Sequence, residues 1–268
     1  MSGFADVHAH LTHAGMRERV PEIVQRAAAA GVTTIISNGL NPLDNLAVRE
    51  LAQAHPSIKP AFGFYPVDTV LHELRASGAE YPREGIECTR EEGIAFVREH
   101  ASEALAVGEI GLDGYWVPEA LWPLQESAFC ELVRIAMDAG KPIIVHTRKR
   151  EQRTFELLRE LGAMRVNWHC FGGKTKLARQ IAEHGHYLSI PANARRSQSF
   201  TRMLETLPRE RLLLETDCPY LSPTPGTPSE PAHVADTARY AAELWKTDLQ
   251  SVLSRIAENF ERLFGVPP

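Results

Sequence analysis

The segment FADVHAH, residues 4–10, sets the pattern on which the rest of the chain is built. Its apolar residues run directly into His8 and His10, and residues i and i+2 of a strand point to the same face. Two imidazoles that project together from the end of a buried strand can chelate one metal ion, since neutral imidazole is the commonest metal ligand. A chance pair of solvated histidines fits so short a motif equally well. The interpretation therefore depends on the residues at the ends of similar strands further along the chain.

Apolar or β-branched runs recur along the whole chain, and helix-like segments separate them. The predicted strands cover residues 4–10, 32–37, 58–64, 104–110, 142–146, 165–169, 186–190 and 211–216. The predicted helices cover residues 21–30, 43–55, a segment opened by Thr89 as N-cap, 123–139, 151–161, 174–184, 198–207, 232–245 and 249–264. Continuous apolar strands that alternate with helices at the period of a βαβ unit, roughly 30 residues, indicate a parallel sheet buried on both faces. We therefore predict an α/β fold, a (β/α)8 TIM barrel, as a single domain over residues 1–268.

Residues with ligand chemistry lie at or near the carboxyl ends of several predicted strands. The candidates are His8, His10, Glu109, His146, His169 and Asp217. In a closed barrel all strand ends surround one mouth, where active sites lie, whereas a doubly wound sheet would not gather these positions. Any one of these histidines also fits a structural role. Buried ionisable groups are costly unless they are paired or bind a metal, so the whole set favours a metal centre.

Imidazole and carboxylate ligands together suit zinc, manganese, iron or magnesium better than calcium, and four histidines favour zinc or manganese over magnesium. We expect one or two divalent ions, with Glu109 as the carboxylate that bridges them. Two ions roughly 4 Å apart can hold both the attacking and the leaving oxygen of a hydrolysis and can activate a water molecule. Asp217 would accept a proton from that water, so Glu109 and Asp217 are the candidate catalytic residues.

Cationic side chains follow three of the strands, although the chain carries a formal net charge of -5. Arg148, after the fifth strand, is the candidate substrate-binding residue, because guanidinium binds anionic oxygens in a bidentate manner. The other cations near these strand ends are Lys174, Lys176, Arg195 and Arg196. A basic rim favours phosphate esters, while the start of a solvated helix is the plainer interpretation. Tyr65, Trp116 and Trp122 could stack on bases or could simply pack.

The cysteine pattern and the segment composition predict the cellular compartment of the protein. The four cysteines form no CxxC motif, which fits a reducing cytosol, and we expect a cytoplasmic protein without a signal peptide or membrane span. Cys170 and Cys218 each follow a candidate ligand, so strand alternation predicts that both turn away from the site as buried apolar residues. Residues 67–88 are predicted to be irregular, either a functional loop or a surface insertion. We expect a monomer or weak oligomer.

Several motifs together resemble the TatD-type metal-dependent hydrolases. They are the HxH start, GEIGLD at 108–113, PIIVHTR at 142–148, HCFGG at 169–173 and LETDCPYL at 214–221, and the likeness extends to Asn259 and Phe260. The nearest variant is the archaeal-like branch, judged from FYP at 64–66 and SIPAN at 189–193. The resemblance implies an amidohydrolase-superfamily barrel with one ion on His8, His10, Glu109 and Asp217, and another on Glu109, His146 and His169.

The resemblance also implies a deoxyribonuclease, in several members a 3′→5′ exonuclease that prefers single strands, so single-stranded DNA is the expected partner. Three positions depart from the family pattern: Tyr65 stands where many members have histidine, Gly172-Gly173 replaces Ser-Gly, and Pro228-Ser229-Glu230-Pro231 lacks an arginine. The alternative function is hydrolysis of another bond at the same metal site, such as a D-aminoacyl-tRNA ester, an amide or a lactone. A non-enzymatic scaffold is the third possibility, and the complete ligand set argues against it.

Overall fold

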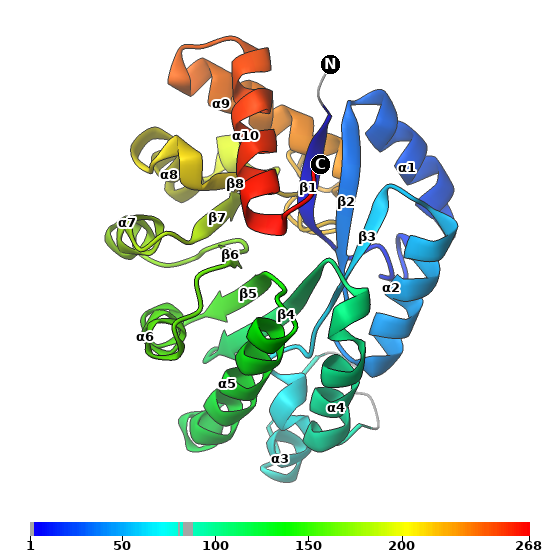
Figure 1. Cartoon of the computed structure of the whole chain (residues 1–268), viewed down its shortest axis with the longest axis vertical. Coiled ribbons are helices and arrows are strands. Elements are labelled where there is room, and N and C mark those ends of the chain that lie inside the picture. Colours follow the sequence, from blue (N-terminus) through cyan, green and yellow to red (C-terminus); the bar gives the residue numbers. More distant parts are fainter. Residues whose placement is uncertain (1–2, 80, 83–87) are drawn as a thin grey trace.

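The computed structural model describes residues 3–79, 81–82 and 88–268, and it contains one sheet of eight parallel strands in the order β1 to β8 (Figure 1). The strands are β1 (Phe4–Ala9), β2 (Val32–Asn38), β3 (Ile58–Phe62), β4 (Ala106–Asp113), β5 (Ile143–Arg148), β6 (Val166–Trp168), β7 (Tyr187–Ile190) and β8 (Leu212–Leu214). A parallel bridge between Ala9 and Cys218 joins the carboxyl end of β1 to the segment after β8. The predicted (β/α)8 barrel is confirmed.

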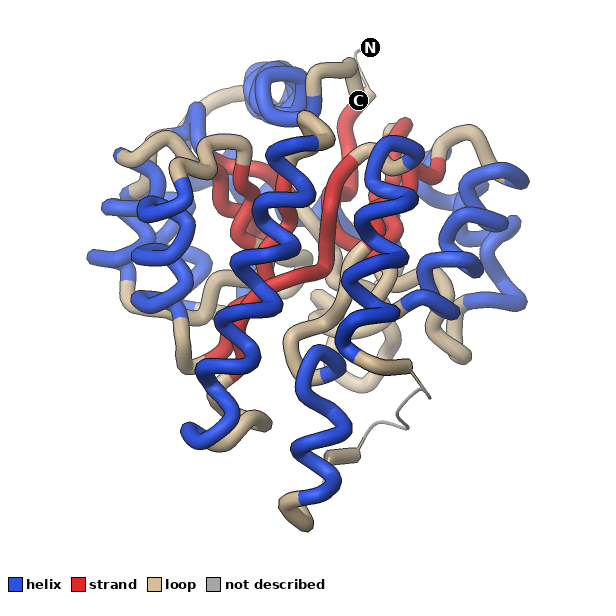
Figure 2. The backbone as a smooth tube through the Cα atoms, turned by 60° about the horizontal axis from the view of Figure 1, so that its bottom comes forward, coloured by secondary structure: helices blue, strands red, loops and turns tan. Residues whose placement is uncertain are grey.

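Helices surround the strands on the outside (Figure 2). They are α1 (Val20–Ala29), α2 (Pro42–Ala54), α3 (Leu71–Ala76), α4 (Arg90–His100), α5 (Trp122–Asp138), α6 (Glu151–Leu161), α7 (Thr175–Glu183), α8 (Gln198–Thr206), α9 (Val234–Trp245) and α10 (Leu249–Phe264). Thr89 caps α4 as predicted, and it forms a capping box with Glu92. No helix within the described residues is long and apolar enough to cross a bilayer.

One end of the barrel is closed by the last helix. Phe260, Leu263 and Phe264 of α10 share a buried cluster with Val7 and Ile144 from inside the barrel. The Asn259 amide donates hydrogen bonds of 2.8 Å to the carbonyls of Arg209 and Leu212, which lie at the amino end of β8. These contacts leave the carboxyl ends of the strands as the accessible mouth, the end where barrel active sites are built.

The prediction that residues 67–88 are wholly irregular is wrong for its first part. A 3-10 turn (Asp68–Val70) leads into α3, and residues 80 and 83–87 lie outside the described part of the chain. Val67, Val70, Leu71 and Leu74 are buried together, at the i, i+3, i+4, i+7 spacing of an amphipathic helix. This spacing was visible in the sequence, although glycine and proline further along obscured it.

The fourth strand is longer than predicted, and this changes the place of Glu109. β4 runs on to Asp113, so Glu109 lies in the middle of the strand rather than at its end. The pairing with β5 shifts register after Val107 and resumes at Ile110, which pairs with Val145. Beyond that point β4 and β5 continue as a two-stranded extension, in which Gly111 lies opposite His146. His146 likewise lies within β5, two residues before its end.

Candidate metal centre

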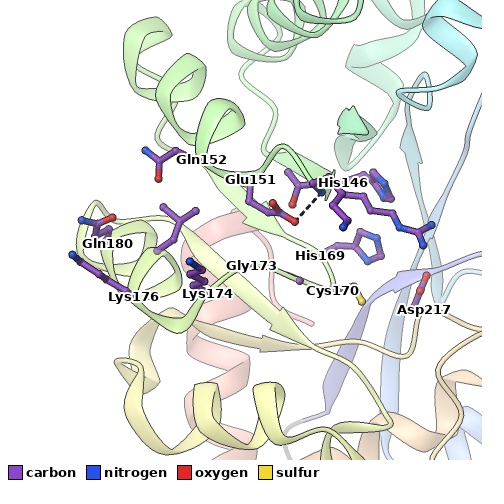
Figure 3. Close-up of a pocket in the computed structure, with 15 residues that line it drawn as sticks. His146, Glu151, Gln152, His169, Cys170, Gly173, Lys174, Lys176, Gln180 and Asp217 are labelled. Atoms are coloured by element: carbon purple, nitrogen blue, oxygen red, sulfur yellow. Dashed lines mark hydrogen bonds between the residues drawn. The ribbon is translucent and has the colours of Figure 1, made fainter. Parts of the chain in front are cut away.

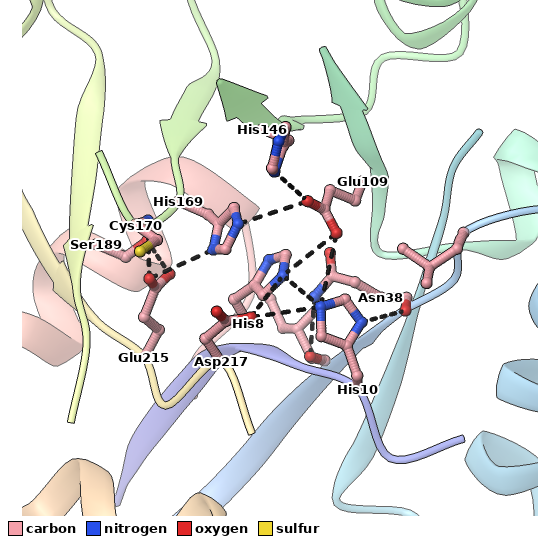
Figure 4. Close-up of polar contacts among 12 residues, drawn as sticks. His8, His10, Asn38, Glu109, His146, His169, Cys170, Ser189, Glu215 and Asp217 are labelled. Atoms are coloured by element: carbon pink, nitrogen blue, oxygen red, sulfur yellow. Dashed lines mark hydrogen bonds and ion pairs between the residues drawn. The ribbon is translucent and has the colours of Figure 1, made fainter. Parts of the chain in front are cut away.

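Four donor atoms from β1, β4 and the segment after β8 converge at the mouth of the barrel (Figure 4). The Nε2 atoms of His8 and His10 lie 3.2 Å apart. Glu109 Oε2 lies 3.7 Å from the first of these nitrogens and 3.6 Å from the second. Asp217 Oδ1 lies 3.7 Å and 3.4 Å from the same two nitrogens. Both carboxylate oxygens therefore lie within 3.7 Å of both ring nitrogens.

The spacing of these donors fits a divalent cation. With ligand distances of about 2.0–2.2 Å, neighbouring donors of a tetrahedral site are roughly 3.3–3.6 Å apart. The separations of 3.2 to 3.7 Å observed here lie close to that range. Within the described part of the chain, Glu109 Oε2 is buried and has no hydrogen-bond partner. A buried carboxylate oxygen without a partner is costly, and a cation among these donors would satisfy it.

The second group of predicted ligands is arranged differently. Glu109 Oε1 lies 2.7 Å from His146 Nδ1 and 3.5 Å from His169 Nε2. The distance of 2.7 Å places His146 in direct contact with the carboxylate, and the ring centroids of His146 and His169 lie 5.9 Å apart. Among the described residues, the groups of donors within 4.8 Å of one another include His8, His10 and Asp217, and also His8, Glu109 and His169. His146 belongs to neither group, and its contact with Glu109 would have to open to admit a second ion.

Three of the four histidines use their outward ring nitrogen to contact a fixed partner. Asp113 Oδ2 lies 3.2 Å from His146 Nε2, and Glu215 Oε1 lies 3.4 Å from His169 Nδ1. His10 Nδ1 lies 3.3 Å from the carbonyl oxygen of Asn38. Such outer partners orient metal-binding imidazoles and select the tautomer that presents a lone pair inward.

Asp113 and Glu215 are not among the site residues predicted from the sequence. Both are fully buried carboxylates, and Glu215 also accepts hydrogen bonds from the Ser189 hydroxyl at 2.5 Å and the Cys170 N–H at 2.8 Å. Asp6 is a third buried carboxylate, and it accepts bonds from the backbone N–H groups of His8 and Thr216. The available signal was an acidic residue inside an otherwise apolar strand, which requires a polar partner.

The backbone explains why the ligands lie so close together. Where Gly63 follows β3, a Cβ atom would lie 2.2 Å from the Glu109 nitrogen, so only glycine allows this approach. Asp217 adopts a left-handed conformation with φ 54°, and its N–H donates to the His8 carbonyl at 2.9 Å. A non-glycine residue is strained in this region of φ and ψ, and such strain is typical of functional sites. This bond places the Asp217 carboxylate beside the histidine pair of β1.

The protonation states of Glu109 and His8 suit a cation, whereas burial opposes protonation of His10, His146 and His169 but the carboxylates beside them raise the pKa of all three imidazoles. Burial opposes ionisation of Glu109, but hydrogen bonds from His146 and His169 hold the pKa of its carboxyl well below the usual value. Burial, together with the neighbouring His169, lowers the pKa of His8 well below its usual value. The His8 and His169 rings stack 3.6 Å apart, which disfavours a positive charge on both. An ionised carboxylate and a neutral imidazole are the forms that bind metal.

A groove of about 1070 Å³ extends from this centre between the segments that follow β5 and β6. Figure 3 shows His169 and Asp217 at one end of the groove and Lys176 and Gln180 at the other. The cationic residues that line it are Arg148, Lys149, Lys174 and Lys176. The Arg148 guanidinium lies over the Tyr115 ring, 3.7 Å from its centroid, and forms no hydrogen bond or ion pair within the described residues.

Two further cations of the predicted basic rim lie elsewhere. Arg195 pairs with Glu243 at 2.6 Å, and Arg196 donates to the Ser222 carbonyl at 3.3 Å. Both line a separate cavity of about 280 Å³ beside α9 rather than the groove. Arg195 and Arg196 therefore do not line the groove that Lys174 and Lys176 line.

The structure also distinguishes between the residues predicted to pack and those that line the site. Cys218 is fully buried as predicted, but Cys170 lines the groove, since its positive φ of 41° breaks the strand alternation. Trp122 packs beneath Arg150, and its indole N–H donates to the Val117 carbonyl at 3.0 Å. Tyr65 instead lies at the mouth, with its ring 5.0 Å from that of His146.

The mouth contains a second, smaller cavity. Its volume is about 400 Å³, and it shares His146, His169 and Asp217 with the groove. Its other walls come from the segments after β1, β2 and β3 and from Tyr220, on the opposite side of the centre from α6 and α7. The candidate metal centre therefore lies where two cavities meet.

Comparison with known proteins identifies the same chemistry. Residues 5–265 match the family described as TatD related DNase. A metal-dependent hydrolase of Bacillus subtilis, YabD, is 30% identical over 269 residues, which cover 97% of this chain and 98% of the relative. A protein of Citrobacter rodentium named 3′-5′ ssDNA/RNA exonuclease TatD is 30% identical over 278 residues, with 97% of each chain covered.

The fold of a solved structure agrees. The crystal structure of YjjV, a TatD homologue from Escherichia coli, superposes with a TM-score of 0.84 at 24% identity and covers 98% of both chains. At this level of identity the likeness concerns the fold alone. The relatives' metal dependence matches the cluster of histidines and carboxylates described here.

Proposed function

This chain belongs to the TatD related DNase family of metal-dependent hydrolases, and on that premise we propose that it cleaves phosphodiester bonds in single-stranded DNA. The observation that carries the proposal is the groove of about 1070 Å³, which opens onto the metal centre and is lined by Arg148, Lys149, Lys174 and Lys176. A chain with a net charge of -5 gathers cations there, as a polyanionic strand requires. The relative named as a 3′-5′ exonuclease supports the same polarity here.

The proposed ligands are His8, His10, Glu109 and Asp217 for one divalent ion, and Glu109, His146 and His169 for a second. Bound there, the ions stabilise charge on phosphoryl oxygens and lower the pKa of a water molecule. Four imidazoles favour zinc or manganese as the bound species over magnesium. The first group already has donor spacings of 3.2 to 3.7 Å, so we expect it to fill before the second.

In the proposed reaction a water oxygen bonds to phosphorus, the bond between phosphorus and O3′ breaks, and O3′ takes up a proton. Asp217 is the proposed proton acceptor for the water, because its carboxylate lies at the accessible edge of the centre, where its side chain is 14% exposed. Glu109 is 3% exposed, so its proposed role is to hold the ions. Arg148 would bind a phosphate oxygen of the strand, since its guanidinium has no anionic partner within the described residues.

The test is cleavage of a 5′-labelled single-stranded oligonucleotide by protein freed of metal with a chelator. Mg²⁺, Mn²⁺ or Zn²⁺ is then added back one at a time, and Glu109→Ala is assayed beside the wild type. We expect a product ladder that shortens from the 3′ end, that requires metal and that the variant does not produce. The variant excludes a contaminating nuclease, and Glu109→Gln, which preserves the side-chain volume, checks that loss of activity is not loss of folding.

An absence of cleavage with every metal would overturn the proposal. The first residue to examine would be Tyr65, whose ring lies 5.0 Å from that of His146 at the mouth and which departs from the histidine that the family resemblance implies. The same preparations would then be assayed with D-aminoacyl-tRNA, amide and lactone substrates. Metal-dependent turnover of one of these would assign the centre to the alternative hydrolysis.

A further inference from the structure

The barrel closes where β1 meets the chain after β8, and this junction is built differently from the others. Backbone ladders join each strand to the next from β1 to β8. Between the described residues of β1 and those beyond β8, the backbone pairing is one isolated bridge, from Ala9 to Cys218. The strand β8 ends at Leu214, three residues before Asp217. The segment that carries this carboxylate therefore depends on side chains for much of its support.

Asp6 supplies the main side-chain contact at this junction. Its Oδ1 atom accepts a hydrogen bond from the Thr216 N–H at 2.9 Å, and its Oδ2 atom accepts one from the Thr216 hydroxyl at 2.5 Å. The oxygen of the same hydroxyl accepts a bond from the Cys218 N–H at 3.3 Å. Asp6 and Thr216 are both fully buried, so these bonds are shielded from water. One carboxylate thus holds the backbone on both sides of Asp217.

Asp6 also contacts the backbone of its own strand. The pairing of β1 with β2 passes from Asp6–Ile35 to Ala9–Ser37, so three steps along β1 lie opposite two steps along β2. The His8 N–H lies within this bulge and donates to Asp6 Oδ1 at 3.2 Å. Bulges redirect the side chains beside them and are common near active sites. Asp6 therefore supports the backbone at His8 as well as the segment around the second proposed ligand.

This role differs from that of the other buried carboxylates around the centre. Asp113 and Glu215 contact the imidazole rings of His146 and His169 directly. The hydrogen bonds of Asp6 within the described residues go to backbone N–H groups and to one hydroxyl. Asp6 is therefore placed to set backbone positions, whereas the other two carboxylates orient rings.

On the basis of the proposed function and its metal centre, we propose that Asp6 is a positioning residue for hydrolysis. Through Thr216 it holds Asp217 beside the imidazoles of β1, in a backbone conformation with φ 54° that is strained for a residue other than glycine. Without this support the segment relaxes, and Asp217 Oδ1 leaves its place 3.7 Å and 3.4 Å from the His8 and His10 nitrogens. The first ion then loses a proposed ligand, and the attacking water loses its proposed proton acceptor.

The test removes the Thr216 hydroxyl, because Asp6→Ala could prevent folding. Thr216→Val preserves the side-chain volume but deprives Asp6 Oδ2 and the Cys218 N–H of their partner, whereas Thr216→Ser keeps the hydroxyl. Equilibrium dialysis with Mn²⁺, and separately with Zn²⁺, measures metal affinity. We expect the affinity for the first ion to fall about 10- to 100-fold in Thr216→Val and to stay near the wild-type value in Thr216→Ser.

Asn259→Leu is the matched control for a merely structural role. Asn259 is also fully buried, and it bonds to the carbonyls at the amino end of the same strand, β8. Thr216→Val and Asn259→Leu are both expected to lower the urea midpoint, but only Thr216→Val is expected to weaken metal binding. With saturating Mn²⁺, Thr216→Val should lower kcat for a single-stranded oligonucleotide at least about tenfold and leave KM unchanged, since Arg148 still binds the strand.

The dialysis results decide the role of Asp6. Wild-type metal affinity in Thr216→Val would overturn it, and so would an equal loss of affinity in Thr216→Ser or in Asn259→Leu. The same results decide it even if the wild type cleaves no DNA, in which case the proposed nuclease function alone falls. A wild type that binds neither ion would overturn both proposals.

Discussion

The buried histidines at the two ends of the barrel have different polar surroundings. At the amino end of the strands, the Nδ1 atom of His186 accepts a hydrogen bond from the Trp168 indole at 3.1 Å, and its Nε2 atom donates to the Ala163 carbonyl at 2.8 Å. At the mouth, the Nε2 atoms of His8 and His10 lie 3.2 Å apart and face the carboxylates of Glu109 and Asp217. Burial of a histidine is therefore no sign of a site. The sign is several ring nitrogens that converge on one point while protein groups hold their other sides.

The strongest test of this difference replaces one histidine at each end of the barrel. His8 and His186 form a matched pair, because both are 0% exposed. His8→Ala is expected to lower the metal content and to reduce the proposed DNA hydrolysis by about a thousandfold or more, because it removes a proposed ligand of the first ion. His186→Ala is expected to keep metal and activity at 25 °C but to lower the free energy of unfolding by about 3 kcal/mol, because it leaves a cavity and unpaired polar groups.

Metal content after dialysis, oligonucleotide cleavage and urea unfolding would be measured for both variants. The distinction between the two ends fails if His8→Ala retains both its metal and its activity. It also fails if His186→Ala loses metal without losing stability.

A second test uses pH. Burial lowers the pKa of His186 to about 4, from a usual value of 6.5. Between these two values the unfolded chain binds a proton that the folded protein does not, so the stability supplied by neutral His186 is present above pH 6.5 and is lost as the pH falls toward 4. From pH 7 to pH 5 the loss is roughly 2 kcal/mol.

The measurement is urea unfolding at both pH values for wild type and His186→Gln, with chelator present so that metal release does not contribute. The wild type should lose roughly 2 kcal/mol more than the variant over this interval. Equal losses would show that His186 titrates normally and that the base of the barrel does not exclude its charged form.

These two groups of histidines also show what a sequence can reveal. Strand alternation was enough to group His8 with His10, and the barrel's common mouth was enough to bring Glu109, His146, His169 and Asp217 near them. That these residues bind metal stays a prediction.

The outer partners were not predictable in the same way. Asp113 contacts His146 across 33 positions, through an extension of β4 and β5 whose register depends on the bulge near Glu109. The direction of Cys170 depended on a single left-handed residue, which breaks the alternation on which the prediction rested.

A third test asks whether the outer partners at the mouth matter for metal binding. Asp113→Asn keeps an oxygen that can accept the bonds now made by the backbone N–H groups of Tyr115 and Trp116, but it removes the negative charge beside His146 Nε2. We expect metal affinity to fall about 10- to 100-fold with little change in stability. The control is Glu126→Gln, whose carboxylate pairs with Arg150 and Arg153 away from the centre. Unchanged affinity in Asp113→Asn would reduce Asp113 to a loop-capping role.

The smallest expected effect concerns two arginines, of which Arg148 ends β5 and Arg195 lies in the 3-10 turn Ala194–Arg196 that follows β7. Arg148 lies over Tyr115 at 3.7 Å, and Arg195 lies over Tyr240 at 4.4 Å, so both use the same cation–π support. They differ in their neighbours, because Arg195 pairs with Glu243 at 2.6 Å and Arg148 has no anionic partner within the described residues. A substrate phosphate would complete the surroundings of Arg148, as Glu243 already does for Arg195.

Arg148→Ala should therefore raise KM for a single-stranded oligonucleotide by about tenfold with little change in kcat, while Arg195→Ala should leave both constants unchanged. The difference should shrink as ionic strength rises from 50 to 500 mM, since salt screens an exposed guanidinium from phosphate. Steady-state kinetics of both variants over this range would separate the contribution of the guanidinium charge to binding from that of its packing. An equal rise in KM for both variants would mean that the DNA strand contacts Arg195 as well as Arg148. A rise in KM that salt does not diminish would mean that Arg148 acts through packing on Tyr115 rather than through its charge.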